Sequence, residues 1–166
     1  YRKGLVELRK YITLVENNLR TKDYASIKYD TVPGKALMKY RKAFFRNDED
    51  KFTAHMEAAK KGLTKINSGT LYPYEIVEKY NYGYYFSPRG GYEEIPELEA
   101  MWKNLPDYVD DINGLVVADT SGSMSGQPIS VSVSLALYIA ERNKSEIFKN
   151  YFITFDERPQ LQEVKG

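Results

Sequence analysis

The sequence of 166 residues contains no cysteine and a single histidine, His55. Without cysteine the protein has no disulfide framework, no thiolate metal site and no cysteine nucleophile. A general-base role for His55 needs converging partner side chains, and the sequence names none. Its place on an apolar helical stripe favours a packed, structural histidine instead. The sequence therefore excludes cysteine catalysis and disfavours histidine catalysis.

Long apolar runs are also missing. No stretch approaches the ~20 residues that a membrane-spanning helix requires, and no signal peptide is recognisable at the start of the sequence. We therefore expect a soluble, cytoplasmic protein without membrane association. Because the sequence starts at Tyr1 and not at methionine, we also expect it to be a piece of a longer protein.

Residues 119–126, DTSGSMSG, lack the residues of three common functional loops. A P-loop needs a lysine beside its terminal serine or threonine, and a dinucleotide-binding loop needs G-x-G-x-x-G. The nucleophile elbow of serine hydrolases needs G-x-S-x-G. The segment is therefore a poor candidate for nucleotide binding or for a serine nucleophile.

The net charge is only +1, but the charged residues are distributed unevenly along the sequence. Residues 1–65 contain 16 Lys and Arg against 8 Asp and Glu, a net charge of +8, whereas residues 66–166 contain 8 against 15, a net charge of −7. A basic half suits phosphate backbones, and an acidic half suits a hard cation. The alternative for the basic half is a solvated, lysine-rich helical face.

Residues 1–106 are predicted to form a helical segment. Apolar residues recur at steps of three and four over residues 4–20, which predicts a first helix. A second helix should begin near Pro33 and end near Asn47. Asp48 is a candidate N-cap for a third helix, whose apolar stripe includes His55.

The tyrosine-rich residues 71–92 are harder to assign. A short helix is expected over residues 73–79, but glycine and proline argue against a helix over 81–91. The tyrosines could offer stacking platforms for single-stranded bases, or they could pack a long loop against the helices. A further helical stripe follows at residues 95–105, with Trp102 expected in the core.

Residues 107–166 are predicted to form the amino-terminal part of an α/β domain. The apolar run 115–118 is typical of a buried strand, residues 128–143 of a helix, and residues 151–155 of a second strand. Strand, helix and strand then form a parallel crossover. With a short edge strand at residues 161–164, the sheet has too few strands to be complete, so we expect a truncated domain.

Asp119 directly follows the first predicted strand, and Ser121 and Ser123 follow at alternate positions. One carboxylate and two hydroxyls thus gather at the carboxyl end of a strand, where open α/β sheets bind ligands. Oxygen ligands favour Mg²⁺, Mn²⁺ or Ca²⁺. Because only one ligand is charged, the ion keeps positive charge that can recruit a carboxylate from a partner.

Asp119-Thr120-Ser121-Gly122-Ser123-Met124 resembles the D-x-S-x-S motif of von Willebrand factor A domains, the metal-ion-dependent adhesion site or MIDAS. This resemblance implies a Rossmann-like von Willebrand A sheet. It also implies that Ser121 and Ser123 bind the ion directly and that Asp119 binds it directly or through water. The family's other ligands, a threonine and an aspartate, would fall beyond residue 166. The site is therefore expected to be incomplete, and empty, in this chain alone.

Longer segments, among them LRKYITLVENNL, LYPYEIVEKY and YFITFDERPQLQEVKG, resemble an uncharacterised family, a domain of unknown function. Members of that family are similar to the TROVE and von Willebrand A pairing of Ro ribonucleoproteins. The resemblance implies a TROVE-like helical part that binds small or structured RNA. The chain departs from Ro proteins in supplying too few helices for their ring.

We therefore predict a non-enzymatic, divalent-cation-dependent, Ro-like binding module for protein or RNA partners, with no DNA sequence readout. The metal ligands would be Asp119, Ser121 and Ser123. One alternative is a metal-dependent nuclease or phosphoryl hydrolase, although no second acidic cluster for a metal pair is evident. Another is a structural fragment with an incomplete metal site.

Overall fold

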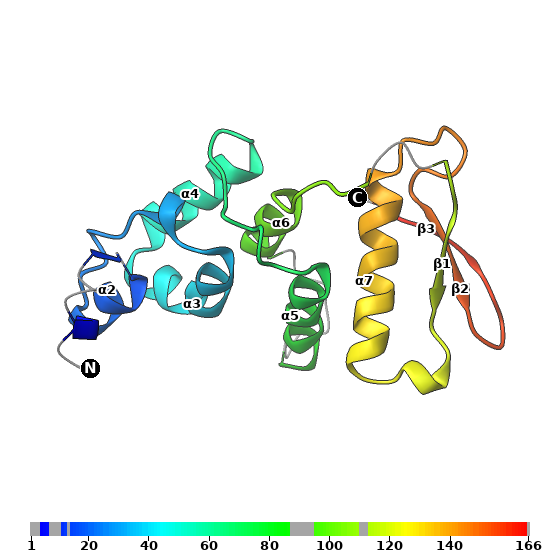
Figure 1. The fold of residues 1–166 in the computed structure, drawn as a ribbon, viewed down its shortest axis with the longest axis horizontal. Helices are drawn as coiled ribbons and strands as arrows, with labels where there is room; N and C mark the ends of the chain where they lie inside the picture. The colour runs from blue at the N-terminus through cyan, green and yellow to red at the C-terminus, as the bar shows by residue number, and fades with distance from the viewer. Residues whose placement is uncertain (1–3, 7–10, 13, 87–94, 110–112, 166) are drawn as a thin grey trace. The chain divides into compact units, whose positions relative to one another are not determined.

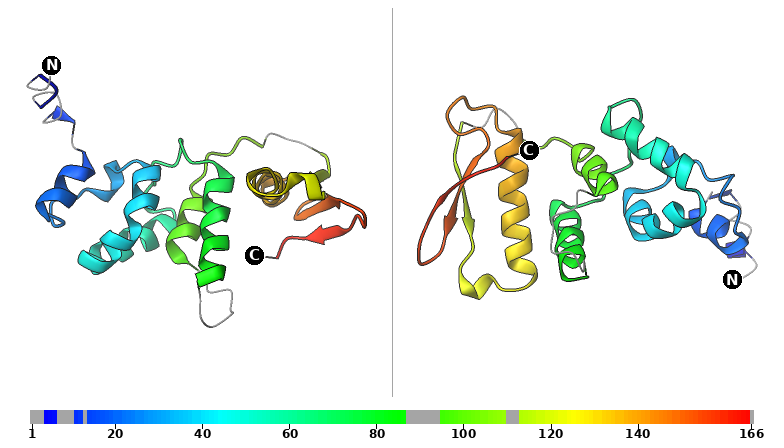
Figure 2. Two further views of the ribbon diagram at one scale, coloured as in Figure 1. Left: turned by 90° about the horizontal axis from the view of Figure 1, so that it is seen from below. Right: turned by 180° about the vertical axis from the view of Figure 1, so that it is seen from behind.

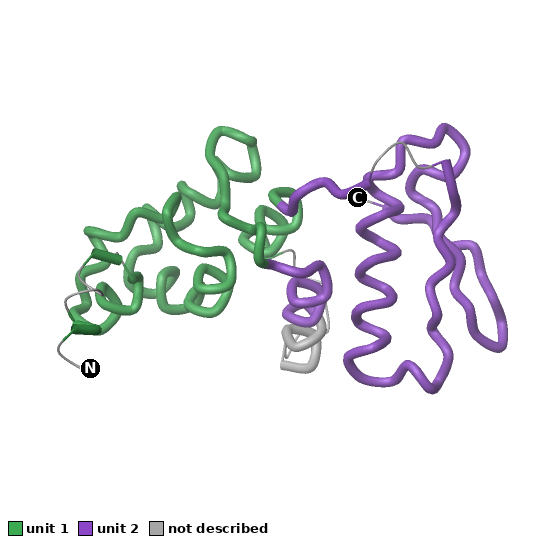
Figure 3. Tube along the Cα trace, viewed as in Figure 1, with its two compact units in different colours: residues 1–70, 94–104 green, residues 71–93, 105–166 purple. Residues whose placement is uncertain are grey.

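The computed structural model describes residues 4–6, 11–12, 14–86, 95–109 and 113–165, except for the side chains of residues 81–86. The chain forms two compact units: residues 1–70 with 94–104, and residues 71–93 with 105–166 (Figure 3). Helices build the first unit, and the second combines helices with a small sheet. The predicted mixture of α and α/β structure is confirmed. The predicted division into domains at residues 106 and 107 stays a prediction, because compact units need not coincide with domains.

The first unit contains α2 (Val15–Thr21), the 3₁₀ turn η1 (Tyr29–Thr31), α3 (Gly34–Asn47), α4 (Glu49–Lys60) and α6 (Pro96–Lys103) (Figure 1). Its core is aromatic. The ring of Tyr29 lies 5.3 Å from that of Phe44 and 5.4 Å from that of Phe52. Both phenylalanines are fully buried, so η1, α3 and α4 converge on one cluster.

The prediction of one helix over residues 4–20 is wrong. Leu14 has an extended backbone, with φ −81° and ψ 123°, and α2 begins only at Val15. Val15 is buried, whereas Ile12 is largely exposed. The apolar residues of this stripe are therefore not all buried on one side of a single helix. Helical periodicity alone could not reveal the break at Leu14. Residues 7–10 and 13 lie outside the described part of the chain.

The second predicted helix is confirmed, since α3 ends at Asn47. Asp48 occupies the N-cap position of α4, as predicted, but its side chain makes no capping hydrogen bond to that helix. Its Oδ2 instead accepts a hydrogen bond of 2.8 Å from the hydroxyl of Tyr29. The Asp48 side chain therefore bonds to a residue 19 positions away and not to the first turn of α4.

In the tyrosine-rich region, α5 (Pro73–Phe86) continues through residues 81–86, where no helix was predicted. Because α5 packs against α7, tertiary contact offsets the helix cost of about 1 kcal/mol for Gly83. Residues 87–94 of this region lie outside the described residues. In α6, Trp102 is only partly buried, while Leu98 and Met101 are fully buried. These two side chains, and not Trp102, anchor that helix in the core.

The sheet of the second unit contains β1 (Val116–Asp119), β2 (Tyr151–Phe155) and β3 (Leu161–Glu163), in the order β1-β2-β3. β1 and β2 are parallel, and β2 and β3 are antiparallel. The 3₁₀ turn η2 (Gly122–Met124) and helix α7 (Gln127–Arg142) connect β1 to β2. The predicted strand–helix–strand crossover and the edge strand are thus confirmed.

Helix α7 lies between α5 and one face of the sheet (Figures 1 and 2). Ala136 and Ala140 pack against Ala118 of β1 and Phe152 of β2. These alanines let the helix approach the strands closely. The opposite face carries Val117, Ile153 and Leu161 in one register row, and Val117 is 59% exposed.

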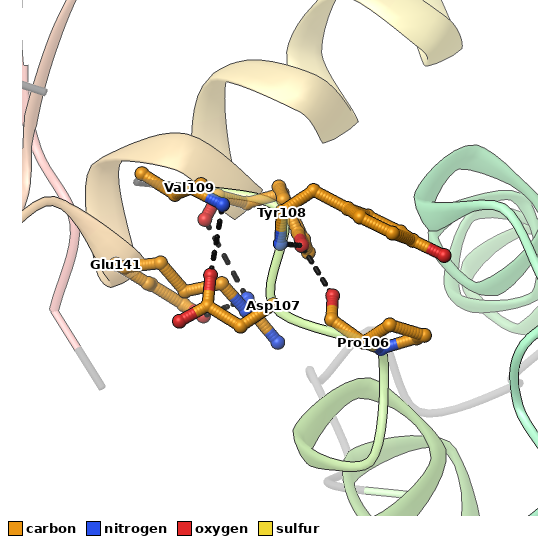
Figure 4. Close-up of polar contacts among 7 residues, drawn as sticks. Pro106, Asp107, Tyr108, Val109 and Glu141 are labelled. Atoms are coloured by element: carbon orange, nitrogen blue, oxygen red, sulfur yellow. Dashed lines mark hydrogen bonds and ion pairs between the residues drawn. The ribbon is translucent and has the colours of Figure 1, made fainter. Parts of the chain in front are cut away.

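Tyr138 of α7 holds the segment that leads toward β1. Its hydroxyl donates to the carbonyl of Pro106 and accepts a hydrogen bond of 2.9 Å from the backbone N–H of Tyr108. Asp107 Oδ1 accepts the N–H of Val109 at 2.9 Å, which closes a tight turn (Figure 4). One buried hydroxyl therefore orders this connection. Within the described residues, no helix is long and apolar enough to cross a membrane.

Candidate metal centre

The candidate metal centre lies at the carboxyl ends of β1 and β2. Asp119 is the last residue of β1, which ends one position later than predicted, and it pairs in register with Phe155, the last residue of β2. Parallel strands bring their carboxyl ends to the same edge of a sheet, where α/β proteins bind ligands. The loop after β1 therefore lies beside the turn after β2.

Short hydrogen bonds bring the three predicted ligands together. Oδ1 of Asp119 accepts the backbone N–H of Ser121 at 3.0 Å. The hydroxyls of Ser121 and Ser123 lie 3.1 Å apart. The N–H of Met124 donates to the Ser121 carbonyl at 2.9 Å, so η2 folds Ser123 back toward the end of β1.

Ser121 stabilises the charged form of Asp119. Hydrogen bonds from the side chain and the backbone of Ser121 lower the pKa of Asp119 below its usual value, against a smaller opposing effect of burial. Hydrogen bonds to a carboxylate stabilise its charged form. The loop thus presents a negative charge at neutral pH.

The donor set fits a hard divalent cation. An octahedral Mg²⁺ with bonds of ~2.1 Å separates adjacent ligand atoms by ~3.0 Å, close to the 3.1 Å between the two serine hydroxyls. No group of three or more His, Cys, Asp or Glu side chains that could hold a metal ion occurs in the described part of the chain. The candidate centre is of another kind, with one carboxylate and two neutral hydroxyls.

Helix α7 begins directly after this loop. Gly126, which precedes it, has φ 90°, a conformation that side chains disfavour, and Pro128 occupies its first turn. Ser123 is exposed, and Asp119 and Ser121 are partly exposed. The three oxygen-bearing side chains can therefore be reached from solvent.

Sequence reasoning missed a second carboxylate at this edge, that of Asp156. The hydroxyl of Thr120 donates to Asp156 Oδ2 at 2.9 Å, and the N–H of Thr120 donates to the Phe155 carbonyl at 3.0 Å. The sequence pattern at residues 156–159 indicates only a turn. An acidic residue directly after the second parallel strand was the available signal.

His55 lies in the aromatic core of the first unit, as predicted for a structural histidine. Its ring centroid is 5.8 Å from that of Tyr29. Its Nε2 is buried without a hydrogen-bond partner among the described residues. Burial lowers the pKa of His55, and the charge of Asp30 opposes this more weakly.

Comparisons with known proteins place the chain among domains without an assigned function. Residues 1–114 match the family model "Domain of unknown function (DUF2828)", and residues 113–166 match "Domain of unknown function (DUF7788)". No solved structure matches the chain.

A curated relative, "Uncharacterized protein L728" of Acanthamoeba polyphaga mimivirus, is 30% identical over 183 residues. The match covers 100% of this chain and 30% of that protein, so the chain spans less than a third of the relative's length. The DUF2828 model covers more than half of the chain. The chain therefore belongs to the DUF2828 family, a domain of unknown function.

Proposed function

We propose that the protein is a non-enzymatic binding module whose loop after β1 holds a divalent cation, Mg²⁺ in the first place and Mn²⁺ or Ca²⁺ as substitutes. The observation that carries the proposal is the convergence of an ionised Asp119 with two serine hydroxyls 3.1 Å apart. The D-x-S-x-S motif and the parallel β1–α7–β2 crossover support a Rossmann-like von Willebrand A domain with a MIDAS.

The ligand chemistry defines the partner at this site. A divalent ion bound by one carboxylate and two neutral hydroxyls keeps a net positive charge. A carboxylate on a protein partner then completes the coordination, because hard cations prefer charged oxygen ligands. Binding of the partner should therefore require the cation.

Calorimetry with Mg²⁺ and Mn²⁺ on the full-length protein, which would supply the further ligands expected beyond residue 166, tests the metal proposal. Wild-type protein should bind one ion, and Asp119→Ala should abolish binding. Ser121→Ala and Ser123→Ala should each weaken it, whereas Ser125→Ala, an exposed serine of the same loop, should not. Equal affinity in wild type and Asp119→Ala would refute the proposal, as would no binding by the wild type.

A second candidate function, RNA binding, is favoured by the surface of α3. Four exposed basic side chains recur along it at steps of four, three and four residues: Lys35, Lys39, Lys42 and Arg46. They form a stripe ~16 Å long, and the helix contains no Asp or Glu. Such a stripe suits the phosphates of an RNA backbone, and the TROVE-like resemblance of the helical part agrees with this partner.

Binding of labelled single-stranded RNA at several salt concentrations tests this second function. If the stripe neutralises four phosphates, the slope of log K against log[salt] should be about −2.8. Lys42→Glu with Arg46→Glu should reduce affinity strongly, and Lys61→Glu with Lys65→Glu provides the same charge change outside the stripe. An equal loss of RNA affinity in the two double variants would contradict a specific binding surface on α3. RNA cleavage in Mg²⁺ that Asp119→Ala abolishes would favour the hydrolase alternative.

A further inference from the structure

One side-chain hydrogen bond ties together the two loops at the candidate metal centre. Thr120 belongs to the loop after β1, and its hydroxyl donates to Oδ2 of Asp156, the first residue after β2, at 2.9 Å. The N–H of Thr120 continues the pairing of the strands by donating to the Phe155 carbonyl at 3.0 Å. Thr120 is therefore attached to the end of β2 through both its backbone and its side chain.

Because of its position in the loop, Thr120 can influence the candidate ligands on either side of it. It lies between Asp119 and Ser121, two of the three candidate ligands. Successive side chains of an extended chain point to opposite sides, so the ligands share one side while Thr120 occupies the other. Attaching Thr120 to β2 thus restrains the backbone that carries Asp119 and Ser121.

Asp156 uses both of its carboxylate oxygens as acceptors. Oδ2 accepts the Thr120 hydroxyl, and Oδ1 accepts the backbone N–H of Arg158 at 2.7 Å. An alanine removes both acceptors, whereas an asparagine could keep both contacts, with its oxygen accepting the Arg158 N–H and its amide donating to the Thr120 hydroxyl. Asp156 therefore closes its own turn and holds Thr120 at the same time.

We propose that Asp156 is a positioning residue for the metal loop. Through Thr120 it preorganises Asp119, Ser121 and Ser123 for the cation, without itself binding the ion. The proposal rests on the cation-binding function proposed above. Serine hydroxyls are neutral and weak ligands, so the affinity of such a site depends strongly on how well they are oriented.

Titration of the full-length protein and four variants with Mg²⁺ or Mn²⁺ tests the positioning role. Thr120→Val, which keeps shape and charge, and Asp156→Ala, which removes both acceptor oxygens, should each weaken cation binding about 10- to 100-fold. The double variant should be no weaker than the worse single variant, since both act through one hydrogen bond. Thr120→Ser, which keeps the hydroxyl, should restore near-wild-type affinity.

Matched controls separate positioning from general stability and from charge. Thr154→Val makes the same change at a threonine whose hydroxyl accepts the Gln160 N–H of the β2–β3 hairpin at 3.1 Å. Asp107→Ala makes the same change in another aspartate-closed turn of the unit. Neither should change cation affinity. Wild-type affinity in Thr120→Val, combined with a large loss in Asp156→Ala, would identify Asp156 as a ligand and overturn the proposal.

Hydrogen exchange in metal-free protein supplies a readout independent of the cation. In Thr120→Val and Asp156→Ala, the amides of Ser121 and Met124 should exchange about tenfold faster, because both donate hydrogen bonds within the loop. Thr154→Val should leave them unchanged. Unchanged exchange in the first two variants would overturn the positioning role. If wild-type protein binds no cation, the metal function fails, and exchange still decides whether Asp156 orders the loop.

Discussion

The hydroxyl of Tyr29 donates a hydrogen bond of 2.8 Å to Oδ2 of Asp48 and so joins η1 to the junction between α3 and α4. The Tyr29 ring is buried against Phe44 and Phe52. Burial, followed by the hydrogen bond to Asp48, raises the pKa of Tyr29. Tyr29 thus lies at the centre of the aromatic cluster and also makes a polar connection between two segments of the first unit.

Replacing Tyr29 with phenylalanine should destabilise the first unit by about 1.5–3 kcal/mol, the range for hydrogen bonds to charged groups. Urea denaturation followed by circular dichroism measures the change. Tyr40→Phe is the matched control, because the Tyr40 hydroxyl donates to Glu16 at an exposed site, at 3.2 Å. Its effect should stay within about 0.5 kcal/mol. Equal losses in both variants would contradict the importance of the Tyr29 bond.

His55 should make stability depend on pH below neutrality. Burial lowers its pKa from the usual 6.5, so just below pH 6.5 the unfolded state binds more protons than the folded state does. Stability should therefore be constant above pH 6.5 and decrease as pH falls from 6.5 toward the folded-state pKa.

Urea denaturation between about pH 5 and pH 8 measures this effect, since histidine is the side chain whose ordinary pKa falls in that range. His55 is the only histidine of the chain. His55→Gln should therefore remove most of the slope between pH 6.5 and the folded-state pKa. A slope that persists in His55→Gln would assign the pH dependence to another group.

The two faces of the sheet should respond differently to truncation. Phe152 packs against Ala118, Ala136 and Ala140 under α7, so Phe152→Ala should cost about 3–5 kcal/mol. Phe155 is 59% exposed on the same strand, and Phe155→Ala should cost less than about 1 kcal/mol. Thermal unfolding of the two variants makes the comparison, and similar losses would mean that the outer face is covered in solution.

Tyr138→Phe keeps the ring over which the Arg142 guanidinium lies, 4.1 Å from the centroid, but removes the hydroxyl that holds residues 106 and 108. We expect a loss of about 1–3 kcal/mol, because the Tyr108 N–H and the Pro106 carbonyl both lose their partner. The Tyr108 amide should also exchange faster in hydrogen-exchange experiments. Tyr108→Phe, at an exposed ring, is the control, and unchanged exchange in Tyr138→Phe would show that the backbone holds the segment.

The sequence alone predicted those parts of the molecule that depend on local pattern. The apolar runs at β1 and β2, the helix between them and the acidic hydroxyl loop all occur where expected. Strand length, a proline in the first helical turn and the order of elements define such a crossover without long-range information. The approach of Asp119, Ser121 and Ser123 to one another could be predicted because all three lie within five residues.

Only the tertiary structure decided which partners distant residues take. Asp48 bonds to Tyr29 instead of capping α4, α5 extends because it packs on α7, and the helix expected over residues 4–20 is interrupted at Leu14. Asp156 meets Thr120 only because β1 and β2 are parallel neighbours with aligned ends. Hydrogen bonding and burial across the fold can outweigh local preferences of about 1 kcal/mol or less. The sequence therefore determined the ligand loop, and the tertiary structure determined what holds it in place.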